Sequence, residues 1–269
     1  MIHMNDVHVT YPGGMTALHS SSLHFRQGEF TVLLGASGAG KSTLLRCLNH
    51  LTPPSGGSIT VEGLGSLDNR RRLYEHRKRT GMIFQQHQLI GRHSALANVL
   101  LGRIGYHSAL RSMFPLPLAE RRIALECLER VGLLHKALER ADRLSGGQQQ
   151  RVGIARALAQ QPRLMLGDEP VASLDPATSH NVLAQLQRIG REDGITTVVS
   201  LHQVDLAQAY ADRVIGLAQG RVVFDGAPSG LTPDVLQAIY QQSGQGVAMP
   251  VTPPVTPSTS VYEFATIED

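Results

Sequence analysis

The chain has 269 residues, 42% hydrophobic and 17% charged, and is long enough to bury a sizeable core in one large domain. Lys and Arg number 25 and Asp and Glu number 22, so the net charge of +3 gives no argument for a nucleic-acid partner. With two cysteines and no apolar run near the roughly 18 residues of a membrane span, disulfides, structural zinc and transmembrane helices are not expected. Any contact with a membrane is therefore expected to be peripheral.

The first segments have the apolar pattern of strands, at Asp6–Thr10 and Leu23–Leu34, with the turn Pro12–Gly14 after the first. We expect them to form a small sheet that leads into the next loop. Tyr11 lies directly before the turn. It is either a half-buried tyrosine at a strand end or an aromatic face on which a purine base stacks.

The stretch at residues 35–42 fits the pattern G-x-x-x-x-G-K-[ST]. A buried strand is predicted before it and a helix after it, so backbone N–H groups at a helix N-terminus would face an anion. In such a loop the lysine contacts the β- and γ-phosphates of a nucleotide such as ATP, and the serine hydroxyl binds Mg²⁺. The alternative is an ordinary glycine-rich turn, which the pattern and its context disfavour. The predicted nucleotide-binding residues are Gly35, Ala36, Ser37, Gly38, Ala39, Gly40, Lys41, Ser42 and Thr43, with Ser42 also a metal ligand.

The middle of the chain is mainly helical in pattern. A basic run at Asn69–Arg79 is most simply a solvated helix face, the alternative being a surface for an acidic partner or lipid headgroups. A strand at Gly81–Phe84 follows, and apolar spacing then predicts helices at Ala95–Leu101 and Ala119–Leu138. We expect a helical subdomain at about 86–160, inserted into an α/β core.

The segment Leu144–Gln148, of sequence LSGGQ, interrupts that pattern before a predicted helix at Gln149–Gln160. Its glycines and the Ser145 hydroxyl lie at the start of a helix, as in the phosphate loop, and predict a second anion-binding site, although this one has no lysine. One chain that binds a single nucleotide has no obvious use for two such sites. We therefore predict that two copies face each other, each placing its residues 145–147 on the γ-phosphate held by the other.

Two carboxylates, Asp168 and Glu169, end an apolar strand. A buried unpaired carboxylate is costly, which favours a functional role over a solvated surface position. Consecutive residues of a strand point to opposite sides, so one carboxylate can face the metal and the other the attacking water. We predict that Asp168 binds Mg²⁺ and that Glu169 is the general base for ATP hydrolysis.

The last third of the chain alternates helices with strands, which predicts a mostly parallel sheet covered on both faces. From Ser243 onwards the chain is rich in Pro and Thr, and we expect a disordered tail at 243–269 rather than a docking segment. The expected elements are helices at Thr178–Glu192, Val204–Ala211 and Pro233–Gln241 and strands at Ile195–Leu201, Arg213–Leu217 and Arg221–Phe224.

Six features in this order resemble the nucleotide-binding subunit of ATP-binding-cassette (ABC) transporters, over about residues 1–240. The resemblance implies an α/β P-loop NTPase fold with a mostly parallel core sheet, an N-terminal antiparallel β subdomain and an inserted α-helical subdomain, all in one domain at 1–242. The six features are the phosphate loop, Gln85 after an apolar strand, Leu144–Gln148, the strand that ends in Asp168 and Glu169, Ser173–Asp175, and His202 after a strand.

The resemblance also implies roles for single residues. Tyr11 would stack on adenine, and Gln85 would reach Mg²⁺ and the attacking water and begin the segment that contacts a membrane subunit. Asp175 would cross the dimer interface, and His202 would contact the γ-phosphate as a catalytic residue. The residues implied to complete the partner's nucleotide site are Ser145, Gly146, Gly147, Gln148 and Asp175.

Three segments, Thr80–Gln86, Ala97–Arg103 and Glu169–Pro176, are similar to the ATPase subunit of bacterial phosphonate importers. This similarity implies a peripheral ATPase on the cytoplasmic face of the cell (inner) membrane. Its partners would be a second copy, membrane permease subunits and, indirectly, a solute-binding protein, with no nucleic acid. The alternatives are a soluble ABC-type ATPase that acts on a non-transport complex, an importer ATPase for a different solute, and a scaffold with little hydrolysis.

Overall fold

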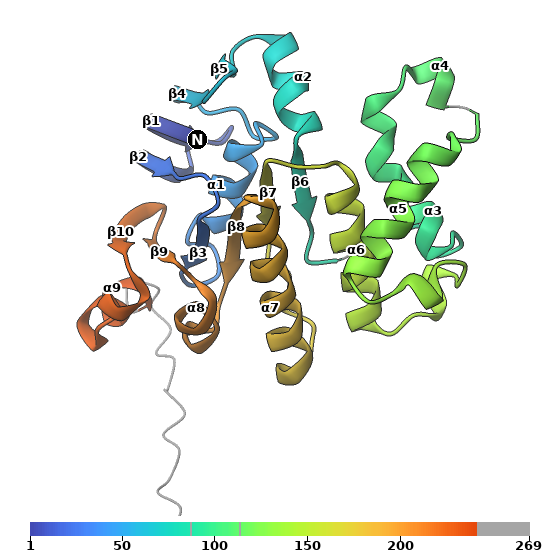
Figure 1. The fold of residues 1–269 in the computed structure, drawn as a ribbon. Helices are drawn as coiled ribbons and strands as arrows, with labels where there is room; N and C mark the ends of the chain where they lie inside the picture. Colours follow the sequence, from blue (N-terminus) through green and yellow to red (C-terminus); the bar gives the residue numbers. More distant parts are fainter. Residues whose placement is uncertain (87, 113, 241–269) are drawn as a thin grey trace, which may run out of the picture.

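The computed structural model describes residues 1–86, 88–112 and 114–240, which form two sheets with helices around and beside them (Figure 1). The expected tail at 243–269 lies outside the described residues. The fold class expected from the sequence is confirmed, because an antiparallel sheet precedes a mostly parallel one.

The first sheet is antiparallel and has the strand order β2-β1-β4-β5. Burial alternates along its strands, as expected of a sheet with one face against a core and the other in solvent. Its strands are β1 (Ile2–Thr10), β2 (Thr16–Phe25), β4 (Gly56–Val61) and β5 (Gly65–Ser66).

The second sheet has the order β10-β9-β3-β8-β7-β6, and all its pairs are parallel except β9 with β10. Its strands are β3 (Phe30–Leu34), β6 (Thr80–Ile83), β7 (Leu164–Gly167), β8 (Thr196–Leu201), β9 (Arg213–Ala218) and β10 (Arg221–Gly226).

The single strand expected at Leu23–Leu34 is wrong. The chain leaves the first sheet at Phe25 and turns through Gly28, whose φ is +72°. It then enters the second sheet as β3, between β9 and β8. The two strands thus belong to different sheets, and the turn at Gly28 carries the chain from one to the other.

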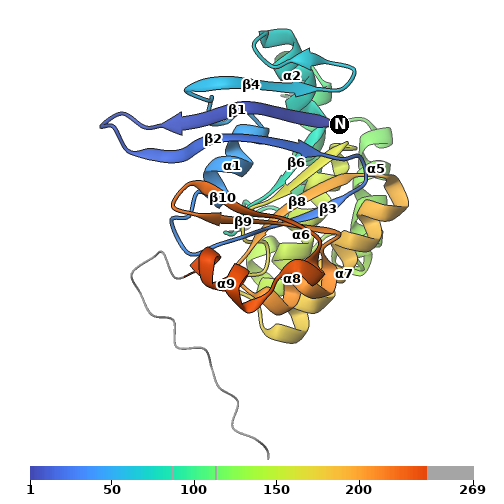
Figure 2. The same ribbon diagram turned by 90° about the vertical axis from the view of Figure 1, so that its left-hand side faces the viewer.

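Helices cover both faces of the parallel sheet. In Figure 2, α1 lies between the two sheets, and α7, α8 and α9 lie on the other side of the parallel sheet. Helices α3, α4, α5 and α6 form a group beside the sheet, whereas α2 lies near β5 and leads into β6 (Figure 1). The helices are α1 (Lys41–Leu48), α2 (Arg70–Lys78), α3 (Ala95–Leu100), α4 (Ala109–Ser112), α5 (Leu118–Arg130), α6 (Gly146–Ala159), α7 (Pro176–Asp193), α8 (Val204–Tyr210) and α9 (Pro233–Tyr240).

All five residues of β3 are buried, since helices or the first sheet cover both faces of the strand. Val32 and Leu34 pack in one hydrophobic cluster and Leu33 in the other. The alternation follows from the two-residue period of a strand and explains why this strand is a continuous apolar run. The phosphate loop is therefore anchored to the centre of the core.

The helix expected at Ala119–Leu138 is shorter than predicted. It ends at Arg130, because Gly132 has a φ of +71° and its N–H donates to the Glu129 carbonyl at 2.8 Å. A short 3₁₀ turn at Leu134–Lys136 follows. The apolar spacing continues through this turn, so the pattern alone does not show where the helix ends.

A buried arginine ties the turn after α3 to the end of α6. The Arg103 side chain is only 5% exposed, and its Nε donates to Glu120 Oε2 on α5 at 2.5 Å. Its Nη1 donates to the Ala159 carbonyl at 2.7 Å, and the nearby Tyr106 hydroxyl donates to the Gln160 carbonyl at 2.6 Å. These bonds satisfy carbonyls that a helix leaves unpaired at its C-terminus. The ion pair thus fixes the position of α6.

Replacing Glu120 by Ala should lower the free energy of unfolding by about 3–5 kcal/mol, because it leaves the buried Arg103 guanidinium without an anionic partner. Burial alone raises the pKa of the Glu120 carboxyl, but hydrogen bonds and charges from Arg103 and His107 outweigh it and hold the pKa below its usual range. This stabilisation is therefore present above the unfolded pKa of about 4.3 and is lost as the pH falls through the lower folded value. Urea unfolding at a series of pH values measures both effects.

Glu129→Ala is the matched control, since Glu129 is an exposed residue of the same helix. It should change the unfolding free energy by less than about 0.5 kcal/mol. Equal effects of the two substitutions would show that the Arg103–Glu120 pair does not hold α6.

Candidate functional site

The loop between β3 and α1 is closely packed at its glycines. A Cβ atom on Gly35 would lie 2.4 Å from the Leu217 carbonyl oxygen, and one on Gly40 would lie 2.7 Å from the Ala17 carbonyl oxygen. Gly40 also has a φ of +101°, and it precedes α1 without a side-chain cap. The first N–H groups of α1 thus have no capping side chain.

Lys41 lies at the start of α1 and is buried. Its Nζ donates to the carbonyls of Gly35 at 2.8 Å and Ala36 at 3.0 Å, so the ammonium lies inside the curve of the loop. Burial lowers the pKa of Lys41, and the charges of Glu169 and Asp168 oppose that shift. The loop therefore combines a buried cation with open helix N–H groups, and both attract an anion.

Ser42 and Asp168 form a hydrogen bond at the carboxyl ends of the parallel strands. Ser42 Oγ donates to Asp168 Oδ1 at 2.8 Å, and Ser200 Oγ donates to the same oxygen at 3.2 Å. Arg46 Nη2 lies 4.0 Å from Asp168 Oδ2. A hydroxyl and a carboxylate placed together are oxygen ligands of the kind that Mg²⁺ prefers, usually with substrate phosphates completing the shell. In the part of the chain that the structure describes, no group of three or more His, Cys, Asp or Glu side chains is arranged to hold a metal ion.

Glu169 is oriented by a turn rather than by a strand. The prediction that strand alternation separates the two carboxylates is wrong, because β7 ends at Gly167 and Glu169 has a φ of +49°. The Glu169 N–H donates to Ser200 Oγ at 2.9 Å. Its Oε1 lies 2.5 Å from His202 Nε2. The turn thus directs Asp168 towards Ser42 and Glu169 towards His202.

Ser200 is the residue that the sequence analysis missed. It is fully buried near the end of β8, yet its hydroxyl bonds to Asp168 and to the Glu169 backbone. In the sequence, the only signal for this role is a single serine in an apolar strand, two residues before His202. The two hydrogen bonds show that Ser200 positions both carboxylates.

Gln85 and Tyr11 occupy the periphery of this edge. Gln85 is exposed in the turn after β6, next to the end of β7 in the parallel register. Tyr11 is half-buried at the end of β1, and its N–H donates to the Met15 carbonyl at 2.9 Å. That hairpin leads into β2, whose Ala17 carbonyl packs on Gly40. Tyr11 thus lies on the hairpin that packs on the phosphate loop, whereas β8 and β7 separate the strand before Gln85 from the strand before the loop.

The LSGGQ segment forms the start of α6. The helix begins at Gly146 rather than at Gln149, so Gly146, Gly147 and Gln148 lie in its first turn. Ser145 caps it: Ser145 Oγ accepts from the Gln148 N–H at 3.3 Å, and the Ser145 N–H donates to Gln148 Oε1 at 3.0 Å. This is a capping box, in which two end groups of a helix satisfy each other.

Gly147 is packed against the next helix. A Cβ atom there would lie 2.7 Å from Thr178 Cγ2 in the first turn of α7. Asp175 caps that helix, accepting from the Thr178 N–H at 3.0 Å. In Figure 1, helix α6 lies in the group of helices beside the sheet, apart from α1.

A glycine-rich loop with a buried lysine, facing carboxylates at the carboxyl edge of a parallel sheet, defines the class of P-loop nucleotide-binding proteins. The sequence pattern of the ABC transporter family matches residues 18–172, and the chain belongs to this family. Among the described residues, no helix has the length and apolar character needed to cross a bilayer.

The chain is similar to two importer subunits over most of its length. It is 65% identical over 240 residues to the phosphonates import ATP-binding protein PhnC 3 of Nostoc sp., which covers 89% of this chain and 92% of that protein. It is 61% identical over 257 residues to the phosphite import ATP-binding protein PxtA of Stutzerimonas stutzeri, covering 96% of this chain and 92% of that protein.

Solved structures share the fold. The dimeric post-hydrolysis state of the ATP-binding cassette MJ0796, bound to ADP and Pi, matches with a TM-score of 0.75 and 35% identity, covering 86% of this chain and 100% of that chain. The ADP conformation of the cassette MJ1267 matches with a TM-score of 0.78 and 26% identity, over 88% and 97% of the two chains. The expected fold of an ABC ATPase is confirmed.

Replacing Gly147 by Ala should lower the free energy of unfolding by about 1–3 kcal/mol, because the added methyl overlaps Thr178 Cγ2. Thr178→Ser removes that methyl, so the double variant should recover most of the loss. Thermal and urea unfolding of the single and double variants measure the contact.

The double variant also separates packing from activity. If Gly147 is needed only for packing on Thr178, ATPase activity returns together with stability. If activity stays low in the restored protein, the glycine has a second role at the nucleotide. Failure of Thr178→Ser to restore any stability would contradict the contact itself.

Proposed function

We propose that this chain is the ATP-hydrolysing subunit of an importer for phosphonate, phosphite or a related oxyanion. The observation that carries the proposal is the linked set Ser42, Asp168, Glu169 and His202 at the mouth of the phosphate loop. The similarity to phosphonates and phosphite import ATP-binding proteins supports import as the process and oxyanions as the solute class.

In this proposal residues 35–43 bind the phosphates of ATP, with Lys41 moving from the loop carbonyls to the β- and γ-phosphates. Ser42 and Asp168 hold Mg²⁺, and Gln85 approaches it from the neighbouring strand end. The metal, when bound, neutralises charge that develops on the phosphates. Tyr11 stacks on the adenine ring.

Glu169 acts as the general base for the attacking water. Its carboxylate oxygen lies 2.5 Å from His202 Nε2, so the histidine orients the base and lies where the γ-phosphate would be. Ser200 holds the backbone of Glu169 in place. Of these three groups, Ser200 is fully buried, whereas Glu169 is partly exposed and His202 is exposed.

The nucleotide site is proposed to be completed by a second copy of the chain. Ser145, Gly146, Gly147 and Gln148 lie at the N-terminus of α6, where N–H groups favour an anion, and Asp175 lies beside them at the start of α7. The dimeric state of the ADP- and Pi-bound cassette MJ0796 supports this arrangement.

The proposed partners are membrane permease subunits and, through them, a solute-binding protein outside the cell. The chain would act peripherally at the cytoplasmic face of the inner membrane. We further propose a single ABC ATPase domain at 1–242, with the helical subdomain at 86–160 inserted. A soluble ATPase outside transport is not favoured, because the similar proteins are import subunits.

Replacing Glu169 by Gln should leave Mg²⁺–ATP binding within about twofold while turnover falls at least about 100-fold, as expected for loss of a general base. The ATP-bound protein should then accumulate as a dimer, because hydrolysis no longer separates the two copies. Steady-state ATPase assays and gel filtration with ATP measure both results.

Glu192→Gln is the control, since Glu192 is an acidic residue near the exposed end of α7, paired with Arg130 and Arg188. It should keep normal turnover and remain monomeric after ATP is consumed. Near-normal turnover of the Glu169→Gln chain would overturn the assignment of the base.

A further inference from the structure

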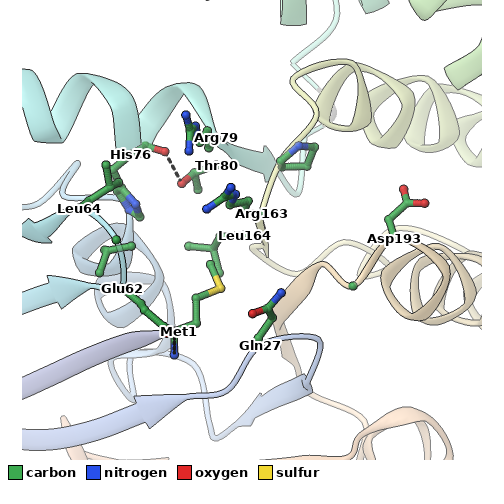
Figure 3. Close-up of a pocket in the computed structure, with 14 residues that line it drawn as sticks. Met1, Gln27, Glu62, Leu64, His76, Arg79, Thr80, Arg163, Leu164 and Asp193 are labelled. Carbon is green, nitrogen blue, oxygen red and sulfur yellow. Dashed lines mark hydrogen bonds and ion pairs between the residues drawn. The ribbon is translucent and has the colours of Figure 1, made fainter.

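A cavity of about 430 Å³ lies at the amino-terminal ends of β6 and β7 (Figure 3), whereas the phosphate loop follows the carboxyl-terminal end of β3. Thr80 and Leu164, the first residues of β6 and β7, line it, together with Val61 at the end of β4 and Leu64 in the turn between β4 and β5. None of the residues proposed for the ATP site lines it. Small-molecule sites are common in concave places where separate structural units meet.

Two arginines enter this cavity from neighbouring strands. Arg79 and Arg163 directly precede β6 and β7, which pair with Thr80 opposite Leu164. The Arg163 N–H donates to the Arg79 carbonyl at 2.8 Å, so the two backbones lie side by side. Figure 3 shows both side chains among the residues that surround the cavity. The register of the sheet thus brings two arginines that line the cavity to neighbouring positions.

The acidic groups of the cavity already have cationic partners. Asp193 accepts two hydrogen bonds from Arg130, at 2.5 and 3.1 Å. Glu62 Oε2 lies 3.6 Å from the amino-terminal ammonium of Met1.

The two arginines of the cavity have fewer carboxylate partners than its acidic residues have cationic ones. The one carboxylate within ion-pair distance of Arg79 is that of Glu75, at 4.0 Å, and Arg163 has none within that distance in the described part of the chain. Burial lowers the pKa of His76, so this histidine adds no positive charge at neutral pH. In the described part of the chain, Arg163 therefore brings positive charge to the cavity without a paired carboxylate, and Arg79 lies 4.0 Å from the carboxylate of Glu75.

We propose that this cavity binds an oxyanion of the phosphate or phosphonate class between Arg79 and Arg163. A guanidinium presents paired N–H donors that match the oxygens of such a group, and two of them suit a doubly charged anion. The apolar side chains of Val61, Leu64 and Leu164 leave room for a small organic substituent on the phosphorus. This site is separate from the phosphate loop and does not depend on ATP hydrolysis.

The test is a calorimetric titration of the full chain with inorganic phosphate. The chain is first saturated with Mg²⁺ and a non-hydrolysable ATP analogue, so that the phosphate loop is filled. Binding of the analogue is measured beforehand, which separates a failure of the proposed ATP site from a failure of this one. The proposal predicts one further phosphate-binding site per chain.

Arg163→Gln and Arg79→Gln should each weaken that phosphate binding at least about tenfold, while Arg163→Lys, which keeps the charge, should weaken it less. Both side chains lie at a partly open cavity, so the variants should fold, and circular dichroism checks this. Arg221→Gln is the control, because Arg221 is an exposed arginine on β10 at the other edge of the sheet. The absence of a second phosphate site, or equal affinity in the Arg79, Arg163 and Arg221 variants, would overturn the proposal.

Discussion

The hydrogen bond from Ser42 Oγ to Asp168 Oδ1 is the contact on which the arrangement of the site depends. It joins the first turn of α1 to the end of β7, two segments far apart in the sequence. It forms because β3, β8 and β7 run parallel and end at one edge, so that the residues after each strand meet there. Ser200 on β8 bonds to the same carboxylate and links the middle strand to this contact.

Local patterns in the sequence predict most of the components of this site. The phosphate loop, the paired carboxylates and His202 each follow an apolar strand, and strand ends are visible in a sequence. What the pattern does not give is the pairing between distant strands. The role of Ser200 depends on the register that places Gly167 opposite Val199, and the Arg103–Glu120 ion pair depends on how α5 packs beside α3.

The three sequence predictions that the structure contradicts fail for similar physical reasons. The interpretation of Leu23–Leu34 as one strand misses the turn at Gly28, although the adjacent Gln27 and Gly28 are a visible turn signal. The helix expected to reach Leu138 stops at Arg130 because a glycine in the left-handed region overrides the apolar spacing. The two carboxylates do point in different directions, as predicted. The reason is a turn at Glu169 and not the alternation of side chains along a strand.

Helix α6 is fixed at both ends, by the capping box of Ser145 and by the Arg103 and Tyr106 bonds near its last carbonyls. In the proposed function, this capped N-terminus lies against the nucleotide of a second copy rather than at the chain's own phosphate loop. The central claim is therefore that each ATP site combines the loop of one copy with Ser145 and Gly147 of the other. Mixed dimers of two differently tagged chains, carrying Lys41→Ala and Ser145→Arg, test it through the amount of Mg²⁺–ATP retained per dimer. With the two substitutions on different chains, one complete site should remain and about one ATP should be retained, whereas both substitutions on one chain should leave none. The opposite result would contradict the claim, because it would place the loop and the LSGGQ segment of each site on the same chain.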